Sequence, residues 1–440
     1  MPGLRRSARR PAQRGIATLA IVAVLFFIVA LVAAYTNRNL IFEQRTSGNQ
    51  WRSTMALEAA EAGVEWALAQ LNTGRIGNDC RPTDDVAQAG FRERFLAIGD
   101  DGVVTPADDA QFACVANADG GWNCDCTADA TPAPAPADGA GIFPAFRGRF
   151  LPSARPGVVR IEVNGCTRLD DRCLAFPSQA LGNEGRASLQ VLLALRSALP
   201  APPAAAVTVE GSLTGAGTLA IAVPDTATGA VALLAGGNAA LEREVFGAAG
   251  SPTDSDRLVF EAAPELANLP GPADWNVADR LFASVFLAPW ATDADGEHRP
   301  YLQQPGALRL DCEAGCNGDD VRAAIALNPG RVLWIDGDVD LDGAAIGSTA
   351  APVLMVVDGG LEVETEVFGV VYVRRTDPDD PAVPWASAGT GRITGALLVE
   401  GSASIGGALT VVHDADVLAL LRRASGSFVR VPGSWADFGP

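Results

Sequence analysis

The feature that most limits how this chain can fold is an uncharged apolar stretch near its beginning, from Ile16 to Thr36. A helix of about 20 apolar residues crosses the hydrocarbon core of a bilayer, so this stretch is long enough to span it. Arginines precede it at positions 5, 6, 9, 10 and 14. Because basic flanks stay in the cytoplasm, the sequence predicts a single-pass segment with a cytoplasmic N-terminus.

The helix is expected to continue beyond the membrane. Residues 37–72 contain no proline, and their only glycines are Gly48 and Gly63. A continuous helix from Ile16 to Asn72 would be about 85 Å long at 1.5 Å per residue.

Two apolar stripes at helical spacing follow the second half of this helix. One stripe consists of Trp51, Met55, Ala59, Ala62 and Trp66, and the other of Leu57, Ala60, Val64, Leu68 and Leu71. Acidic residues, among them Glu61, lie between the two stripes. A helix with two apolar sides is expected to contact two partners, its own globular part and a neighbouring helix; the alternative is burial of both sides within one fold.

Several motifs occur in a characteristic order around this helix. They are an arginine-rich leader ending in Gly15, an uncharged helix directly after it, the polar stretch 43–49, and the sequence Ala59-Ala60-Glu61-Ala62-Gly63. Over residues 10–72 the chain resembles the PilX-type minor pilins of type IV pili. The resemblance implies that a prepilin peptidase removes residues 1–15 and leaves Ile16 as an N-methylated first residue. It also implies contacts with other minor pilins, the major pilin and the inner-membrane assembly platform.

Two residues depart from the family pattern. Most pilins begin with Phe, where this chain has Ile16, and carry Glu at the fifth mature position, where this chain has Ala20. That glutamate pairs with the N-terminal amine of an adjacent subunit, and an unpaired buried charge is costly. Its absence favours a single position, such as the tip of an initiating complex, over repeated incorporation along the shaft. The alternative is that Ala20 belongs to an ordinary membrane anchor.

Eight cysteines lie beyond the membrane segment, at Cys80, Cys114, Cys124, Cys126, Cys166, Cys173, Cys312 and Cys316. An even number in this position predicts disulfides and an oxidising compartment. Cys166 with Cys173, and Cys312 with Cys316, can close short loops, while the pairing of the other four stays open. The spacing does not suit zinc, so no metal and no other cofactor is expected.

The remainder of the chain is predicted to be β-rich. Residues 73–198 are expected to form a pilin-like region with disulfides, the proline-dense residues 199–206 a linker, and residues 207–440 a β-rich domain. In this last domain a β-branched residue, an acid and a glycine recur at uneven spacing, as in Ile335-Asp336-Gly337. Short strands that turn at glycine predict a partial β-solenoid or a layered sheet, which the sequence does not distinguish. The predicted fold class is α+β.

Charge and motifs exclude several functions. The net charge is −19 without a single lysine, so neither nucleic-acid binding nor a lysine-containing phosphate loop is expected. Asp338, Asp340, Asp342 and Gly343 resemble a calcium loop, but the twelfth position from Asp338 is Thr349 instead of a glutamate. These acids are therefore interpreted as the solvated side of a strand. No group of residues converges on catalysis, so the chain is not expected to be an enzyme.

The sequence thus predicts a minor pilin that takes part in the assembly or initiation of a type IV pilus, at or near the filament tip. It would enter the bacterial inner membrane, face the periplasm and then reach the cell surface, where a tip adhesin is a further candidate partner. Two alternatives fit the same features: a tip pseudopilin of a type II secretion system, and a membrane-tethered surface protein that binds or processes carbohydrate.

Overall fold

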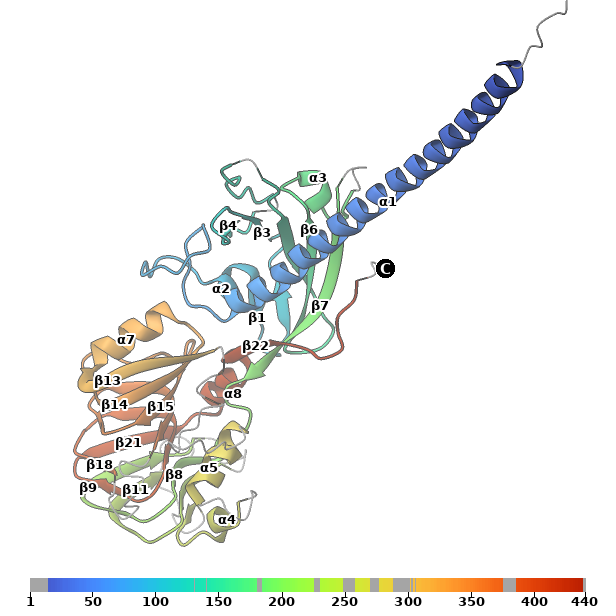
Figure 1. Cartoon of the computed structure of the whole chain (residues 1–440). Coiled ribbons are helices and arrows are strands. Elements are labelled where there is room, and N and C mark those ends of the chain that lie inside the picture. Colours follow the sequence, from blue (N-terminus) through green and yellow to red (C-terminus); the bar gives the residue numbers. More distant parts are fainter. Residues whose placement is uncertain are drawn as a thin grey trace, which may run out of the picture.

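The computed structural model describes residues 15–129, 131–139, 141–179, 184–224, 230–247, 258–269, 277–287, 301, 304, 306–374 and 385–437. Three parts follow one another in space: a free helix, a helix packed on a sheet, and a body of curled β-structure (Figure 1). The mixed α+β architecture with a β-rich C-terminal region is as predicted from the sequence.

The first element, α1 (Gly15–Leu71), is a continuous helix of 57 residues, which corresponds to a length of about 85 Å. Its N-terminal half projects away from the rest of the molecule, and its C-terminal half lies on a sheet (Figure 1). The expected extension of the apolar stretch into one long helix is thus present.

The sheet under α1 is antiparallel, with the order β22-β7-β6-β5-β3-β4. Its strands are β3 (Gln111–Ala116), β4 (Trp122–Asp125), β5 (Ala145–Leu151), β6 (Val158–Cys166), β7 (Arg186–Ser197) and β22 (Gly426–Arg430). Short elements complete this pilin-like part: α2 (Phe91–Phe95), the pair β1 (Leu96–Ile98) and β2 (Val104–Pro106), and α3 (Asp171–Leu174). In β7, Leu189, Val191 and Leu193 are buried under the helix, which is the alternation expected for a half-exposed strand.

Small residues let α1 approach this sheet closely. Ala56, Ala60 and Ala67 are buried at the contact. At Gly63 a Cβ atom would lie 2.7 Å from Val163 Cγ1 and 2.8 Å from the Phe146 ring, closer than side-chain carbons normally pack. Glycine at this position therefore sets the distance between the helix and strands β5 and β6.

The β-rich part is a stack of coils in which every strand pair is parallel. Its strands are β8 (Ala205–Val209), β9 (Leu213–Ala222), β10 (Val231–Ala235), β11 (Ala239–Phe246), β12 (Val259–Phe260), β13 (Ala307–Asn317), β14 (Val332–Leu341), β15 (Val353–Asp358), β16 (Leu361–Val363), β17 (Glu366–Val373), β18 (Trp385–Ser387), β19 (Arg392–Val399), β20 (Ala403–Ile405) and β21 (Ala408–His413). One coil contributes three short segments, as in β15, β16 and the first half of β17. The part is therefore a β-solenoid, one of the two forms that the sequence left open.

The chain does not build this solenoid from one end to the other. Strand β8 enters the middle of the stack, between β10 and β19, and β9 lies between β11 and the pair β20 and β21. After β12 the chain crosses to the opposite end, where β13 starts a second series that returns through β14, β15, β17 and β19 to β8. The first and last coils of the domain are thus neighbours in its interior.

Helices cover one side of the stack. Helices α5 (Val277–Phe286) and α8 (Ala415–Ala424) both contribute buried residues to the cluster on this side. Phe282 and Leu421 are buried against Trp334, Tyr372 and Leu398 on successive coils. Two further short helices are α4 (Pro264–Ala267), next to α5, and α7 (Gly318–Leu327), which packs on β13 and β14.

The C-terminal strand differs from the predicted domain division. β22 pairs with β7, and Ala436 forms a bridge with Gln190, so the last described residues belong to the pilin-like sheet. The exposed fraction of Trp435 is 43%, and Phe438 lies outside the described residues. The division of the chain into two domains near residues 199–206 remains a proposal. Residues 426–437 belong in space to the pilin-like region of residues 73–198.

Hydrogen bonds hold the end of α1 and the loop after it to strand β22 and to the solenoid. The N–H group of Arg75 donates to the Leu327 carbonyl at 2.9 Å, and the amide of Asn72 bonds both backbone groups of Phe428 at 2.8 and 2.9 Å. Arg92 donates from Nε to the Leu71 carbonyl and from Nη2 to the Gly426 carbonyl. The end of α1 is therefore fixed to the strand that leaves the solenoid.

Gly63→Ala is expected to destabilise the pilin-like part by about 1–3 kcal/mol, because the added methyl group overpacks the contact with Val163 and Phe146. The free energy of unfolding in urea, measured on the purified full chain, tests this. Gly48→Ala is the matched control, since nothing lies within 4 Å of its added carbon and alanine favours a helix. Equal stability of the two variants would contradict the proposed role of Gly63.

Gly395→Ala is expected to destabilise the solenoid by about 2–4 kcal/mol, because Gly395 has φ +142° and the new carbon would lie 1.9 Å from the Gly369 carbonyl oxygen. Gly406→Ala serves as the control within the same domain, since its nearest neighbour would be 3.6 Å away. Urea unfolding followed by circular dichroism distinguishes the two. An unchanged transition for Gly395→Ala would show that the coil corner tolerates a side chain.

Candidate functional site

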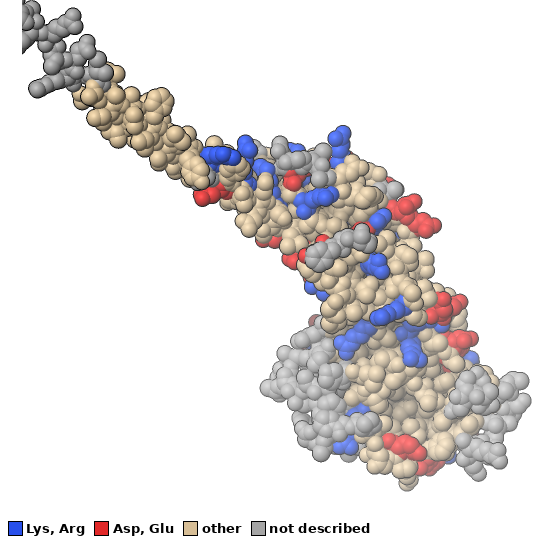
Figure 2. Space-filling view, turned by 90° about the vertical axis from the view of Figure 1, so that its right-hand side faces the viewer, with Lys and Arg blue, Asp and Glu red and all other residues tan. Residues whose placement is uncertain are grey.

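The free half of α1 is the largest exposed apolar surface among the described residues. The exposed fractions of Leu19, Phe26 and Leu31 are 69–74%. The most apolar stretch of the helix has a mean hydropathy of 2.9, and none of it is buried. By length and composition this helix can cross a membrane. Figure 2 shows the free segment without charged groups until it reaches the rest of the molecule.

The residues at which the sequence predicts processing lie at the start of this helix. Gly15 is its first residue and Ile16 its second, and residues 1–14 lie outside the described part of the chain. Ala20 is exposed on the free segment and contributes no charge. The proposed cleavage after Gly15 therefore falls at the boundary between the leader and the helix.

The structure divides the first predicted stripe between the helix's own sheet and solvent. Ala59 is buried, Met55 is half-buried, and Trp51 is 50% exposed. Trp66 is half-buried, with its ring centroid 5.5 Å from that of Phe112 and 5.7 Å from that of Phe146. The chain's own core thus contacts part of the apolar surface that the sequence predicted to contact a neighbouring helix.

The second stripe lies on the sheet. Ala60, Val64 and Leu71 are buried, and Leu57 and Leu68 pack against the same core. Between the stripes the acids Glu58, Glu61 and Glu65 are exposed, and Glu65 forms an ion pair with Arg430 of β22. The surface of α1 open to a partner near the sheet is consequently acidic, with Trp51 at its membrane-proximal end.

All eight cysteines form disulfides. The two short loops close as Cys166–Cys173 and Cys312–Cys316. The remaining four pair as Cys80–Cys126 and Cys114–Cys124, which settles the alternative that the sequence left open. The first of these fixes the loop after α1 to the chain that follows β4, and the second links neighbouring strands β3 and β4.

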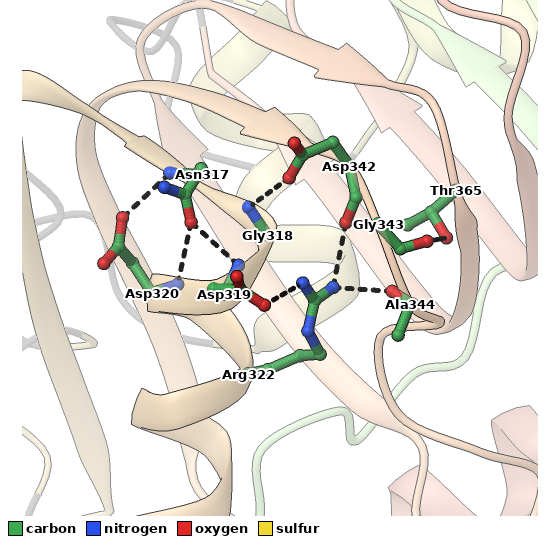
Figure 3. A network of polar contacts seen from close by, with 9 residues as sticks. All are labelled: Asn317, Gly318, Asp319, Asp320, Arg322, Asp342, Gly343, Ala344 and Thr365. Atoms are coloured by element: carbon green, nitrogen blue, oxygen red, sulfur yellow. Dashed lines mark hydrogen bonds and ion pairs between the residues drawn. The ribbon is translucent and has the colours of Figure 1, made fainter.

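The aspartates that resemble a calcium loop have structural partners. The carboxylate of Asp342 accepts from the Gly318 N–H at 3.0 Å, and Arg322 donates to the Asp342 and Ala344 carbonyls (Figure 3). A reciprocal capping box between Asn317 and Asp320 starts α7 beside them (Figure 3). These contacts anchor α7 to the next coil.

The neighbouring acids stay in solvent. Asp338 accepts from the Gly360 N–H at 2.7 Å, and Asp340 is exposed. The pKa of Asp340 is raised by partial burial and then by the negative charges of Asp342 and Glu362. Within the described ranges no group of three or more His, Cys, Asp or Glu side chains could hold a metal ion. A further acidic sequence, Asp293-Ala294-Asp295-Gly296-Glu297, lies outside the described residues.

Sequence reasoning did not find the residues that hold the end of α1 to strand β22. Asn72 is 5% exposed and Arg92 8% exposed, and both bond backbone groups more than 300 positions away. A polar residue at the end of a helix and an arginine in a five-residue helix give no signal of such contacts.

A long N-terminal apolar helix whose second half packs on an antiparallel sheet defines the pilin-like class. Residues 14–65 match the family model described as PilX N-terminal. The N-terminal segment of the chain is thus of the PilX type.

Comparison with solved structures and curated proteins adds little. The competence-associated pilin ComZ from Thermus thermophilus is similar at 13% sequence identity, with 88% of this chain and 97% of that chain covered and a TM-score of 0.22. A TM-score this low carries no argument about fold or function. No curated protein matches the chain.

Replacing Cys80 and Cys126 together by serine is expected to cost about 4 kcal/mol of stability, because their sequence separation of 46 residues closes a large loop in the unfolded chain. The same replacement of Cys312 and Cys316, separated by 4 residues, is expected to cost about 2 kcal/mol. Thermal unfolding of both variants under oxidising conditions measures the difference. A larger loss from the shorter loop would refute this order.

Proposed function

We propose that this protein is a minor pilin that takes part in the initiation of type IV pilus assembly, at or near the filament tip. The observation that carries the proposal is the combination of a PilX-type N-terminal segment with an uncharged residue, Ala20, at the fifth position after the cleavage site. A prepilin peptidase would cut after Gly15, and Ile16 would become the methylated N-terminus.

The position of the solenoid in the molecule supports a location of this subunit at the end of the filament. It joins the pilin-like part at the end of α1 opposite to the free apolar segment (Figure 1). In a filament whose core holds the apolar helices, the solenoid would project outward beyond the pilin-like part. A subunit at the tip has space for such an addition, whereas each shaft position would have to accommodate it between neighbours.

The partners follow from the same helix. Other minor pilins and the major pilin would contact the free segment and the acidic surface of Glu58 and Glu61. The prepilin peptidase and the inner-membrane platform would act before assembly, and a tip adhesin would contact the outward parts. The protein would lie in the inner membrane with its globular parts in the periplasm, and later at the cell surface. We assign it no enzymatic activity.

Mass spectrometry of the membrane-extracted protein tests the processing step. In cells with an active prepilin peptidase, residues 1–15 are expected to be absent, and Gly15→Leu is expected to retain them and to abolish surface pili. Gly3→Leu, within the same leader but away from the junction, is the control and should be cleaved normally. Retention of residues 1–15 in the wild-type protein would refute the assignment; normal pili but failed protein secretion in a deletion strain would favour a secretion pseudopilin.

Ala20→Glu is expected to raise the number of copies per filament, because a carboxylate at this position can pair with the N-terminal amine of an adjacent subunit. Quantitative mass spectrometry of sheared pili gives the ratio of this protein to the major pilin. Ala23→Glu places the same charge elsewhere on the helix and should lower incorporation. An unchanged or lower ratio for Ala20→Glu would contradict the reason given for a tip position.

A further inference from the structure

A cavity of about 470 Å³ lies at the joint between the pilin-like part and the solenoid. Arg92 and Leu96 line it from the pilin-like side, Leu333 and Val353 from the coils, and Leu421 from α8. Its volume lies within the range of small-molecule sites, about 300–1,000 Å³. Nothing in the proposed role of the free helix uses this cavity.

The charges around the cavity are positive, although the chain as a whole is strongly negative. Three arginines are among its lining residues, Arg75, Arg92 and Arg331, against one acidic residue, Glu93. The remaining wall is mostly apolar and includes Ile98. A cationic group next to apolar walls is complementary to an anion with an apolar body.

Arg92 has a hydrogen-bonding group without an acceptor. Its Nε and Nη2 atoms donate to the Leu71 and Gly426 carbonyls at 3.2 and 2.8 Å, and its Nη1 atom is buried without a partner. Nη1 lies beside Gly330 on the cavity wall, 3.5 Å from where a Cβ atom of that residue would be. A buried donor without an acceptor is unfavourable, and a charged one more so.

The charge of Arg92 persists at neutral pH. The pKa of Arg92 is lowered to about 10, chiefly by burial; the negative charge of Glu93 opposes this shift, and the positive charge of Arg331 adds to it. At pH 7 the group is therefore protonated. Of the groups that face it, Glu93 supplies the opposing charge, and Glu93 is itself exposed to solvent.

We propose that this cavity binds a carboxylate with an apolar body, a chemistry shared by medium-chain fatty acids and the C-terminal residues of peptides. The planar guanidinium group of an arginine matches a carboxylate in geometry and charge. The carboxylate would accept from Arg92 Nη1 within the field of Arg75 and Arg331. The apolar body would lie against Leu96, Leu333 and Leu421.

Entry of the ligand requires a local movement. Nη1 is buried, and Gly330 of the turn of residues 328–331, at φ +70°, lies beside it. This turn has to open for a carboxylate to reach Nη1. Because the cavity walls come from both parts, a bound ligand stabilises their present arrangement by mass action.

Isothermal titration of the full chain in lipid nanodiscs tests the proposal, with empty nanodiscs as the blank. The probes are hexanoate and N-acetyl-leucyl-leucine with a free carboxyl group, and the neutral analogues are 1-hexanol and the amide of the same peptide. Both carboxylates, or one of them, should bind at least tenfold more tightly than their neutral analogues. The tighter carboxylate identifies the source, fatty acid or peptide terminus.

Glu93→Gln is the decisive variant, because it removes the one carboxylate of the cavity from an exposed position. We expect it to tighten carboxylate binding roughly three- to tenfold. Glu265→Gln, on exposed α4, is the matched control and should leave binding unchanged. Arg92→Met should abolish binding, but it also removes bonds to Leu71 and Gly426, so its thermal unfolding must be measured alongside.

Three outcomes would overturn the proposal. They are no binding of either carboxylate to protein with wild-type thermal unfolding, equal binding of the neutral analogues, and an affinity for carboxylates that Glu93→Gln leaves unchanged.

Discussion

The arrangement of this molecule depends on the hydrogen bonds at the end of α1. Asn72 bonds both backbone groups of Phe428, a residue 356 positions further along the chain, and Arg92 holds carbonyls from α1 and from the start of β22. Strand β22 completes the edge of the pilin-like sheet only after the chain has passed through the whole solenoid. The end of α1 is therefore held to β22 by buried side chains, and the loop after it is held to the solenoid by the hydrogen bond from Arg75 to Leu327.

The recurring acid–glycine motif shows how chain order and spatial order differ in the solenoid. The motif occurs four times, at residues 209–211, 335–337, 357–359 and 399–401. Ile335 pairs with Val357, Val399 pairs with Val209, and Val373 pairs with both Val357 and Val399, so the four motifs occupy the same corner of different coils. Their spacing along the chain is uneven because β8 and β9 insert beside coils that are formed almost 200 residues later. A strict repeat was therefore invisible in the sequence, although the structure is regular.

The site residues differ in whether the sequence alone could identify them. Ile16, Ala20 and Gly63 could be selected from the sequence because each belongs to a local pattern of charge, hydropathy and helix spacing. The stripe of Trp51, Met55, Ala59 and Trp66 was selected by periodicity, which identifies apolar surface but not what covers it. In the structure Trp66 packs with Phe112 and Phe146 of the chain's own core, while Trp51 stays half exposed. Arg92 and its cavity had no local signal, since each wall comes from a distant segment.

By itself the sequence determined the long helix, its uncharged first half, the acidic surface and the β-rich remainder, because hydropathy, helix period and proline content act over a few neighbouring residues. The tertiary structure decided the choice of a solenoid over a layered sheet. Both faces of its parallel strands are buried, as for Met355 and Val356 on opposite sides of β15, and such strands carry no alternation that reports their partners. It also decided the return of β22 and the arginine-lined joint, because both depend on contacts between residues that only folding brings together.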